Sequence, residues 1–137
     1  MAVIKELLRS EADGSISFGN YELSEKSKLD DFAHQGDIYK VKTFGEITKL
    51  EKNGMFLYES VPGTTVSSLK MTDSGISFTV EGKEDAQITI GLEDDCEYDV
   101  TIDGEDHGQM KSNMSGKIML SVELDEGKAV SVSVSKK

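Results

Sequence analysis

The chain has 137 residues and a net charge of −11, with 36% apolar residues, thirteen Gly, one Cys and no Trp. This length allows one domain or two small ones. So acidic a surface repels phosphate backbones and anionic lipid headgroups, so we expect neither nucleic acid nor a membrane as partner. The lone thiol, Cys96, excludes an internal disulfide and suits a reducing compartment. Residues 1–15 are charged from position 5 onward and do not form a signal peptide, which predicts a cytoplasmic protein.

The beginning of the chain allows two interpretations. Residues 2–10 (AVIKELLRS) place their large apolar side chains at helical spacing, which favours a short N-terminal helix. The alternative is a strand, because Asp13-Gly14 follows and residues 15–23 have the pattern of its hairpin partner. Residues 24–37 are polar and charged, and they predict a loop or a brief helix.

A hairpin is the clearest local signal in the first half. Residues 38–44 (IYKVKTF) predict a strand, and Asn53-Gly54 then separates two β-prone segments, 46–52 and 55–60. Asn-Gly favours the tight turn of a hairpin because both residues tolerate positive φ. Pro62 and Gly63 interrupt the pattern and mark the best domain boundary.

In the second half, apolar and polar residues alternate in one short segment after another, which is the pattern of half-buried strands. The sequence therefore predicts an all-β fold of two small antiparallel parts packed together. Residues 1–62 form the first part, and residues 64–137 form an immunoglobulin-like β-sandwich. The strands expected after the boundary are 66–72, 76–81, 86–93, 96–103, 117–125 and 129–135, with a long loop over 104–116.

One acidic segment is the candidate for binding a metal. Residues 93–106 contain eight acidic residues and no basic one. Asp99, Asp103 and Asp106 could offer the hard oxygen ligands that calcium prefers, although their spacing differs from that of an EF-hand loop. The alternative is a solvated acidic face beside turns. No other metal or cofactor is expected.

Catalytic motifs are not found in the sequence. Cys96 and His107 are the only Cys/His pair to consider, and no third residue suggests itself to orient them. The acidic residues crowd a strand and turns with no apolar segment to desolvate them, so they do not suggest a general acid and base. We therefore predict no catalytic residue and a protein that is not an enzyme.

Two resemblances add to this interpretation. Residues 98–134, with YDVTIDG, a loop ending in SG, KIMLSVELDEG and AVSVSV, resemble C-terminal β-sandwich modules of bacterial glycan-active enzymes. Residues 11–23, 37–63 and 84–90 resemble small uncharacterised bacterial all-β proteins that often carry an endosialidase-like label. A sialidase clamps its sugar carboxylate with several arginines, and this chain has only Arg9. The resemblance therefore transfers no catalytic residue.

These observations predict a cytosolic interaction or self-assembly module without catalytic activity. A protein partner or a homo-oligomer is expected, because two thin cores should bury apolar surface against each other or against a copy. An edge strand or the apolar N-terminal segment would make that contact. The alternative is a carbohydrate-binding or accessory module with a glycan ligand, and a hydrolase is the third hypothesis.

Overall fold

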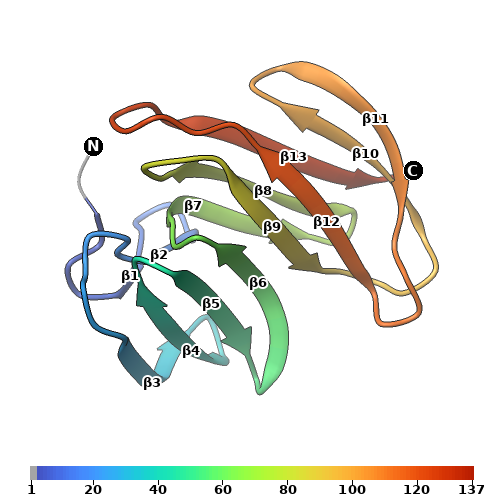
Figure 1. Ribbon diagram of the computed structural model, residues 1–137. Helices are drawn as coiled ribbons and strands as arrows, with labels where there is room; N and C mark the ends of the chain where they lie inside the picture. Colours follow the sequence, from blue (N-terminus) through green and yellow to red (C-terminus); the bar gives the residue numbers. More distant parts are fainter. Residues whose placement is uncertain (1–2) are drawn as a thin grey trace.

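Alternating apolar side chains assemble this chain into two antiparallel sheets that pack face to face (Figure 1). The computed structural model describes residues 3–137, which contain strands and turns and no helix. The all-β prediction is therefore confirmed for these residues. The strands are β1 (Leu8–Ser10), β2 (Ile16–Phe18), β3 (Ser27–His34), β4 (Asp37–Phe44), β5 (Ile47–Lys52), β6 (Met55–Val61), β7 (Thr65–Thr72), β8 (Gly75–Glu81), β9 (Ala86–Gly91), β10 (Glu97–Ile102), β11 (Glu105–Lys111), β12 (Lys117–Val122) and β13 (Val130–Lys136).

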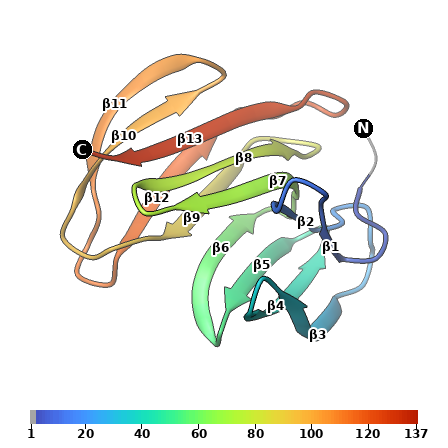
Figure 2. The ribbon, with the colours of Figure 1, turned by 180° about the vertical axis from the view of Figure 1, so that it is seen from behind.

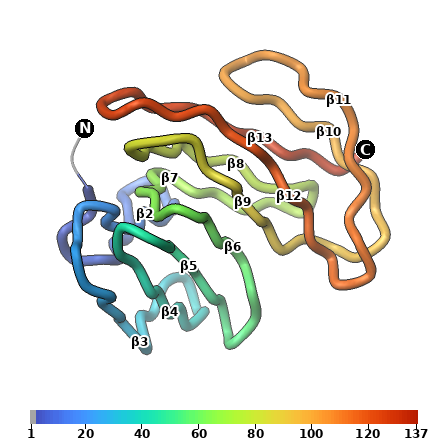
Figure 3. Tube along the Cα trace, viewed as in Figure 1, coloured from blue at the N-terminus to red at the C-terminus, as the bar shows by residue number. Residues whose placement is uncertain are grey.

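The chain crosses repeatedly between the two sheets. One sheet has seven strands in the order β1-β2-β7-β8-β13-β10-β11, and the other has six in the order β12-β9-β6-β5-β4-β3. On one side of the sandwich β1 contacts β3. On the other side the β10–β11 hairpin projects past β12, as Figures 1 and 2 show from opposite directions. The tube in Figure 3 follows the connection from β11 to β12, where the chain passes from one sheet to the other.

Both halves of the chain contribute to both sheets. β2 pairs with β7, and β6 pairs with β9. The boundary predicted at residues 62–64 therefore does not coincide with the division into sheets. The immunoglobulin-like detail for residues 64–137 stays a prediction.

Three aromatic rings form the centre of the core. Tyr58 from the six-stranded sheet packs edge-on between Phe18 and Phe78 of the seven-stranded sheet, with ring centroids 5.2 and 5.6 Å apart. All three are buried, and edge-to-face contacts of this kind stabilise aromatic clusters beyond the area they bury. These rings join the two sheets, and they come from both halves of the sequence.

A chain of buried hydroxyl groups lies beside this centre. The Thr48 hydroxyl donates to the Thr64 carbonyl at 2.8 Å and accepts the Thr64 backbone N–H at 3.0 Å. Thr43 shares a hydrogen bond of 2.8 Å with Thr48, and Thr64 does so with Tyr58 (2.7 Å) and Ser60 (2.8 Å). Because burial disfavours the phenolate, the pKa of Tyr58 lies above its usual range. The network therefore ties the segment after Pro62 to β5 and β6.

The N-terminal helix prediction is wrong over the described part of residues 2–10, and residue 2 lies outside the described residues. The alternative holds instead: β1 pairs antiparallel with β2 after a turn through Asp13-Gly14. Leu7 has a φ of 72°, so a helix could not continue through it. Spacing alone could not separate these two outcomes, because a short apolar segment fits both periods.

One segment predicted as a loop or a brief helix, and another predicted as a loop, are strands. Residues 27–34 form β3, and its register shifts between Leu29 and Phe32, where Asp31 has a positive φ of 57°. The predicted loop 104–116 contains β11, which is exposed over almost its whole length. Both strands lie at sheet edges. A bulged or exposed edge strand lacks the strict alternation by which a strand is recognised in sequence.

The Asn53-Gly54 hairpin is confirmed. Asn53 and Gly54 have φ values of 52° and 78°, and they join β5 to β6. The Asn53 amide also donates to Asp37 at 2.9 Å and its side-chain oxygen accepts the Ile38 N–H at 2.9 Å. The turn is therefore fastened to β4 as well, which positions the residues that follow it.

Candidate functional site

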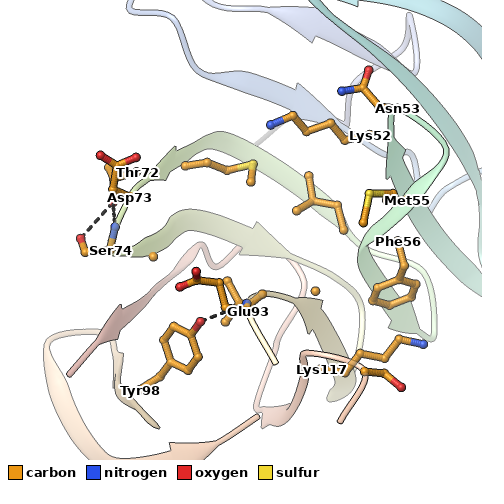
Figure 4. Close-up of a pocket in the computed structure, with 16 residues that line it drawn as sticks. Lys52, Asn53, Met55, Phe56, Thr72, Asp73, Ser74, Glu93, Tyr98 and Lys117 are labelled. Atoms are coloured by element: carbon orange, nitrogen blue, oxygen red, sulfur yellow. Dashed lines mark hydrogen bonds between the residues drawn. The ribbon is translucent and has the colours of Figure 1, made fainter. Parts of the chain in front are cut away.

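A groove of about 580 Å³ lies at one end of the sandwich (Figure 4). The β5–β6 turn, the β7–β8 turn, the segment after β9 and the start of β12 enclose it. Its lining combines large apolar side chains with lysines and carboxylates. The lining residues are Lys52, Asn53, Met55, Phe56, Leu57, Met71, Thr72, Asp73, Ser74, Gly75, Gly91, Leu92, Glu93, Tyr98, Ser115 and Lys117.

Apolar side chains are presented to solvent on one wall of this groove. Met55 follows the Asn53-Gly54 turn and is 72% exposed, and Met71 on β7 is also exposed. Phe56 lies beside Met55 on β6, and the Lys117 ammonium lies 4.5 Å from the centroid of the Phe56 ring. Lys117 lies opposite Gly91 in the pairing of β12 with β9, and glycine has no side chain that would separate the lysine from the Phe56 ring. Flexible methionines beside an aromatic ring form an adaptable contact surface.

Several polar groups of the groove have hydrogen-bond partners within the protein. The Tyr98 hydroxyl accepts the Glu93 backbone N–H at 3.1 Å, as the dashed line in Figure 4 shows. The Glu93 carboxylate accepts from the Lys136 ammonium at 2.6 Å, and this contact raises the pKa of Lys136. No histidine or cysteine is among the described residues that line the groove. The arrangement can bind a ligand by contact and charge, and it contains no paired nucleophile and base.

The predicted calcium ligands lie on one hairpin, but they are spread along it and two of them bond backbone N–H groups. Asp99 and Asp103 are four residues apart along β10 and its turn, or about 13 Å. Asp103 accepts the Ser131 backbone N–H at 3.0 Å, and Asp106 accepts the Gly108 N–H at 2.8 Å. Over residues 3–137 no group of three His, Cys, Asp or Glu side chains could hold a metal ion. The geometry gives the calcium prediction no support.

Cys96 and His107 lie far apart along the β10–β11 hairpin. Cys96 precedes β10 and its backbone bonds Ser112, whereas His107 lies in the bulge beyond Asp106. The positions of Cys96 and His107 along the hairpin differ by four to five residues of strand, or roughly 15 Å. Together they form no catalytic pair.

His34 has a structural role that the sequence did not indicate. Its ring is almost buried at the end of β3. Its Nδ1 lies 2.7 Å from the Ser10 hydroxyl and its Nε2 lies 3.0 Å from the Gly14 carbonyl. A neutral ring with the proton on Nε2 satisfies both contacts, because a carbonyl only accepts. His34 thus joins β3 to the β1–β2 hairpin and closes this side of the sandwich.

Three of the four sheet edges carry features that oppose the addition of another strand. β1 has only three residues. β3 has a shifted register and charged residues along it, and it is tied to β1 through His34. β11 begins with Glu105 and Asp106 and has a bulge near Gly108, where φ is 84°. Short length, charge and bulges are the usual means by which native sheets blunt an edge.

The fourth edge, β12, lacks these features. Its register with β9 is uninterrupted over six pairs, from Lys117 to Val122. Its only charged residue is the first one, and Met119 in its middle is 59% exposed. β12 is thus a regular edge strand whose outer main-chain groups have no strand beside them among residues 3–137.

Comparisons of the chain with known protein families, with curated proteins and with solved structures gave no match. Among residues 3–137 no helix is long and apolar enough to cross a membrane.

Proposed function

We propose that the protein is a non-catalytic interaction module that binds another polypeptide by accepting a strand at the β12 edge. The observation that supports it is the contrast between β12 and the three blunted edges. An extended segment that joins a sheet edge gains main-chain hydrogen bonds with little demand on its sequence. The cytoplasmic location and a homo-oligomeric state stay predictions.

The direction of the main-chain groups on β12 follows from one hydrogen bond at its start. The Leu92 N–H donates to the Gly116 carbonyl at 2.7 Å, which marks a hydrogen-bonded position of the ladder between β9 and β12, although the Gly116 N–H donates to the Asn113 carbonyl instead. Such positions recur at every second residue of an antiparallel ladder. Ile118 and Leu120 therefore bond β9 through their main chain, and the N–H and C=O groups of Met119 and its alternate neighbours point away from the sheet.

The other contact surface predicted from the sequence is used within the fold. Val3 and Ile4 of the apolar N-terminal segment are buried, and the Ile4 N–H donates to the Gly19 carbonyl at 3.1 Å. These side chains are therefore not available to a partner in the folded chain. An edge strand is the remaining one of the two surfaces.

Selection from a displayed library of random nine-residue peptides tests this proposal. We expect peptides to enrich on the immobilised wild-type chain and not on a Met119→Pro variant. Proline at position 119 removes an N–H that points to solvent, so the fold tolerates it while a second strand loses a donor. Circular dichroism and thermal unfolding confirm that the variant is folded. If no peptide enriches on the wild type, or if enrichment is equal on both chains, the proposal is wrong.

The groove favours a second candidate function, a carbohydrate-binding or accessory module. The observation behind it is the half-buried Phe56 ring beneath Lys117 in a groove that Lys52 also lines, because an aromatic ring and a cation together can hold a sugar or its carboxylate. The resemblance of residues 98–134 to modules of glycan-active enzymes points the same way. A glycan array followed by calorimetry tests it, and binding that Phe56→Ala does not reduce would place the glycan elsewhere.

A further inference from the structure

The two sheets differ in their number of strands, and the difference lies at the β12 edge. If strands are counted across the sandwich from the side where β1 contacts β3, β10 lies over β12. β11 is then the seventh strand of its sheet, and no strand of residues 3–137 lies beneath it. Both views of the ribbon agree, since the β10–β11 hairpin projects past β12 (Figures 1 and 2).

The burial of the inward side chains on β10 and β11 agrees with this alignment of the two sheets. Tyr98 and Val100 face inward from β10 and are buried. Ile102 at the far end of β10 and Met110 on β11 are only partly buried, although both pack against the core. The inner face of the hairpin is therefore covered as far as β12 reaches and is left partly open beyond it.

We propose that an extended segment of another polypeptide binds as a seventh strand beside β12, beneath the β10–β11 hairpin. This inference deepens the proposed function, because it assigns the position and chemistry of the strand that the open edge accepts. The segment gains main-chain hydrogen bonds from Met119 and Ser121, and its inward side chains cover Ile102 and Met110. The outer main-chain groups of Lys117 already bond Asn113, at 3.0 and 3.1 Å, so the new bonds begin at Met119.

The surroundings define the sequence of this segment. An antiparallel strand places each inward residue opposite Ile118, Leu120 or Val122, all of which are buried, so these positions take Val or Ile. Opposite Lys117 an acidic residue is favoured, and opposite the exposed Glu123 a basic one. The resulting pattern, read from its amino end, is KVTVTVE.

The structure disfavours a second copy that pairs through its own β12. Antiparallel pairing of two identical strands requires a two-fold axis perpendicular to the sheet. Since each β11 already overhangs the position of the added strand, the β10–β11 hairpins of the two copies would occupy the same space. A single extended segment meets no such obstacle, which is why we assign the position to a strand from a partner.

The test uses the full chain with the strand fused to its end. The Lys137 N–H donates to the Glu97 carbonyl at 3.0 Å, so the carboxyl terminus is held near the start of β10. A Gly/Ser linker of about 15 residues has an end-to-end distance of roughly 20 Å, comparable to the length of β12. One fusion carries KVTVTVE, and its control carries KTVVVTE, which has the same composition without the alternation.

We expect the KVTVTVE fusion to melt about 3 °C or more above the control. We also expect the Met119 and Ser121 amides to exchange about tenfold more slowly, since a tethered strand has an effective concentration on the order of millimolar. Equal melting temperatures, or unprotected Met119 and Ser121 amides, overturn the inference. If library peptides nonetheless enrich on the wild type, the proposed function stands. Sedimentation that shows a dimer protecting these two amides would assign the position to a second copy and also overturn it.

Discussion

Replacing Thr48 by valine should destabilise the fold more than the small change in side-chain volume suggests. The two side chains have nearly the same shape, so the change removes a hydroxyl without leaving a cavity. In the folded chain that hydroxyl donates to the Thr64 carbonyl, accepts the Thr64 N–H and contacts the Thr43 hydroxyl, at 2.8, 3.0 and 2.8 Å. All three residues are buried, so water cannot replace the lost partner.

The magnitude follows from the groups left without a partner. The Thr64 N–H and carbonyl each lose a buried hydrogen bond, at a cost of about 1–3 kcal/mol per group. The Thr43 hydroxyl donates to Thr48 and so also loses its acceptor, but it still accepts the Asn20 N–H at 2.9 Å and we leave it out of the sum. Thr48→Val should therefore lower the free energy of unfolding by about 3 kcal/mol. Tyr58→Phe should cost about 1 kcal/mol, because Ser60 still contacts the Thr64 hydroxyl at 2.8 Å.

Urea unfolding followed by far-ultraviolet circular dichroism measures both changes. With a slope of about 2 kcal/mol per molar urea, Thr48→Val should lower the midpoint by about 1.5 M. Thr89→Val, on the half-exposed outer face of β9, is the matched control and should shift stability by no more than about 0.5 kcal/mol. A loss below about 1 kcal/mol in Thr48→Val would refute the claim that this network supports the fold.

Two further predictions concern single groups. In the free chain the Leu120 amide should exchange slowly with solvent and the Met119 amide fast, because only the Leu120 N–H bonds β9. The reverse order of exchange rates would show that the main-chain direction assigned to β12 is wrong. The Ser15 hydroxyl and backbone N–H hold the pKa of Asp13 at about 2, so this carboxylate stabilises the fold above about pH 4 and the effect disappears as pH falls through 2. Ser15→Ala should raise that pKa, as measured by NMR titration, and an unchanged value would contradict the assigned cause.

Much of the fold follows from local sequence chemistry. The Asn53-Gly54 hairpin was predictable because few dipeptides adopt two consecutive positive φ values easily. The strands β8, β9, β12 and β13 were predictable because one of their faces is buried, so their side chains alternate strictly. The order of strands could not be predicted, because the period of a strand says which face is buried and nothing about its neighbour.

The two missed strands were hidden for one physical reason. β3 and β11 lie at sheet edges, and both faces of such a strand tolerate polar residues. In β3 the bulge at Asp31 also shifts the alternation by one position, so no window of constant period covers the strand. The β1 helix prediction failed differently, since a short apolar segment fits the helical and the strand period equally well.

The candidate sites also depend on neighbours in space, which the sequence alone does not reveal. The acidic segment was conspicuous in sequence, but Asp103 accepts a backbone N–H of the neighbouring strand β13, and Asp106 accepts the Gly108 N–H in the bulge of β11. Contacts of this kind with backbone N–H groups give acidic residues a structural role at a hairpin end. The β12 edge has no signature in its own sequence, because openness is a property of what lies beside a strand.

The inconspicuous sequence of β11 and the open edge of β12 then have a common origin. β11 contributes one apolar inward residue, Met110, and it could not be recognised as a strand because no strand of residues 3–137 lies beneath it. A strand that the chain itself covered would have needed the usual alternation. The same missing layer leaves the main-chain groups of Met119 and Ser121 without partners in the sheet. A sandwich with seven strands over six is thus completed most simply by one more strand, supplied by another polypeptide.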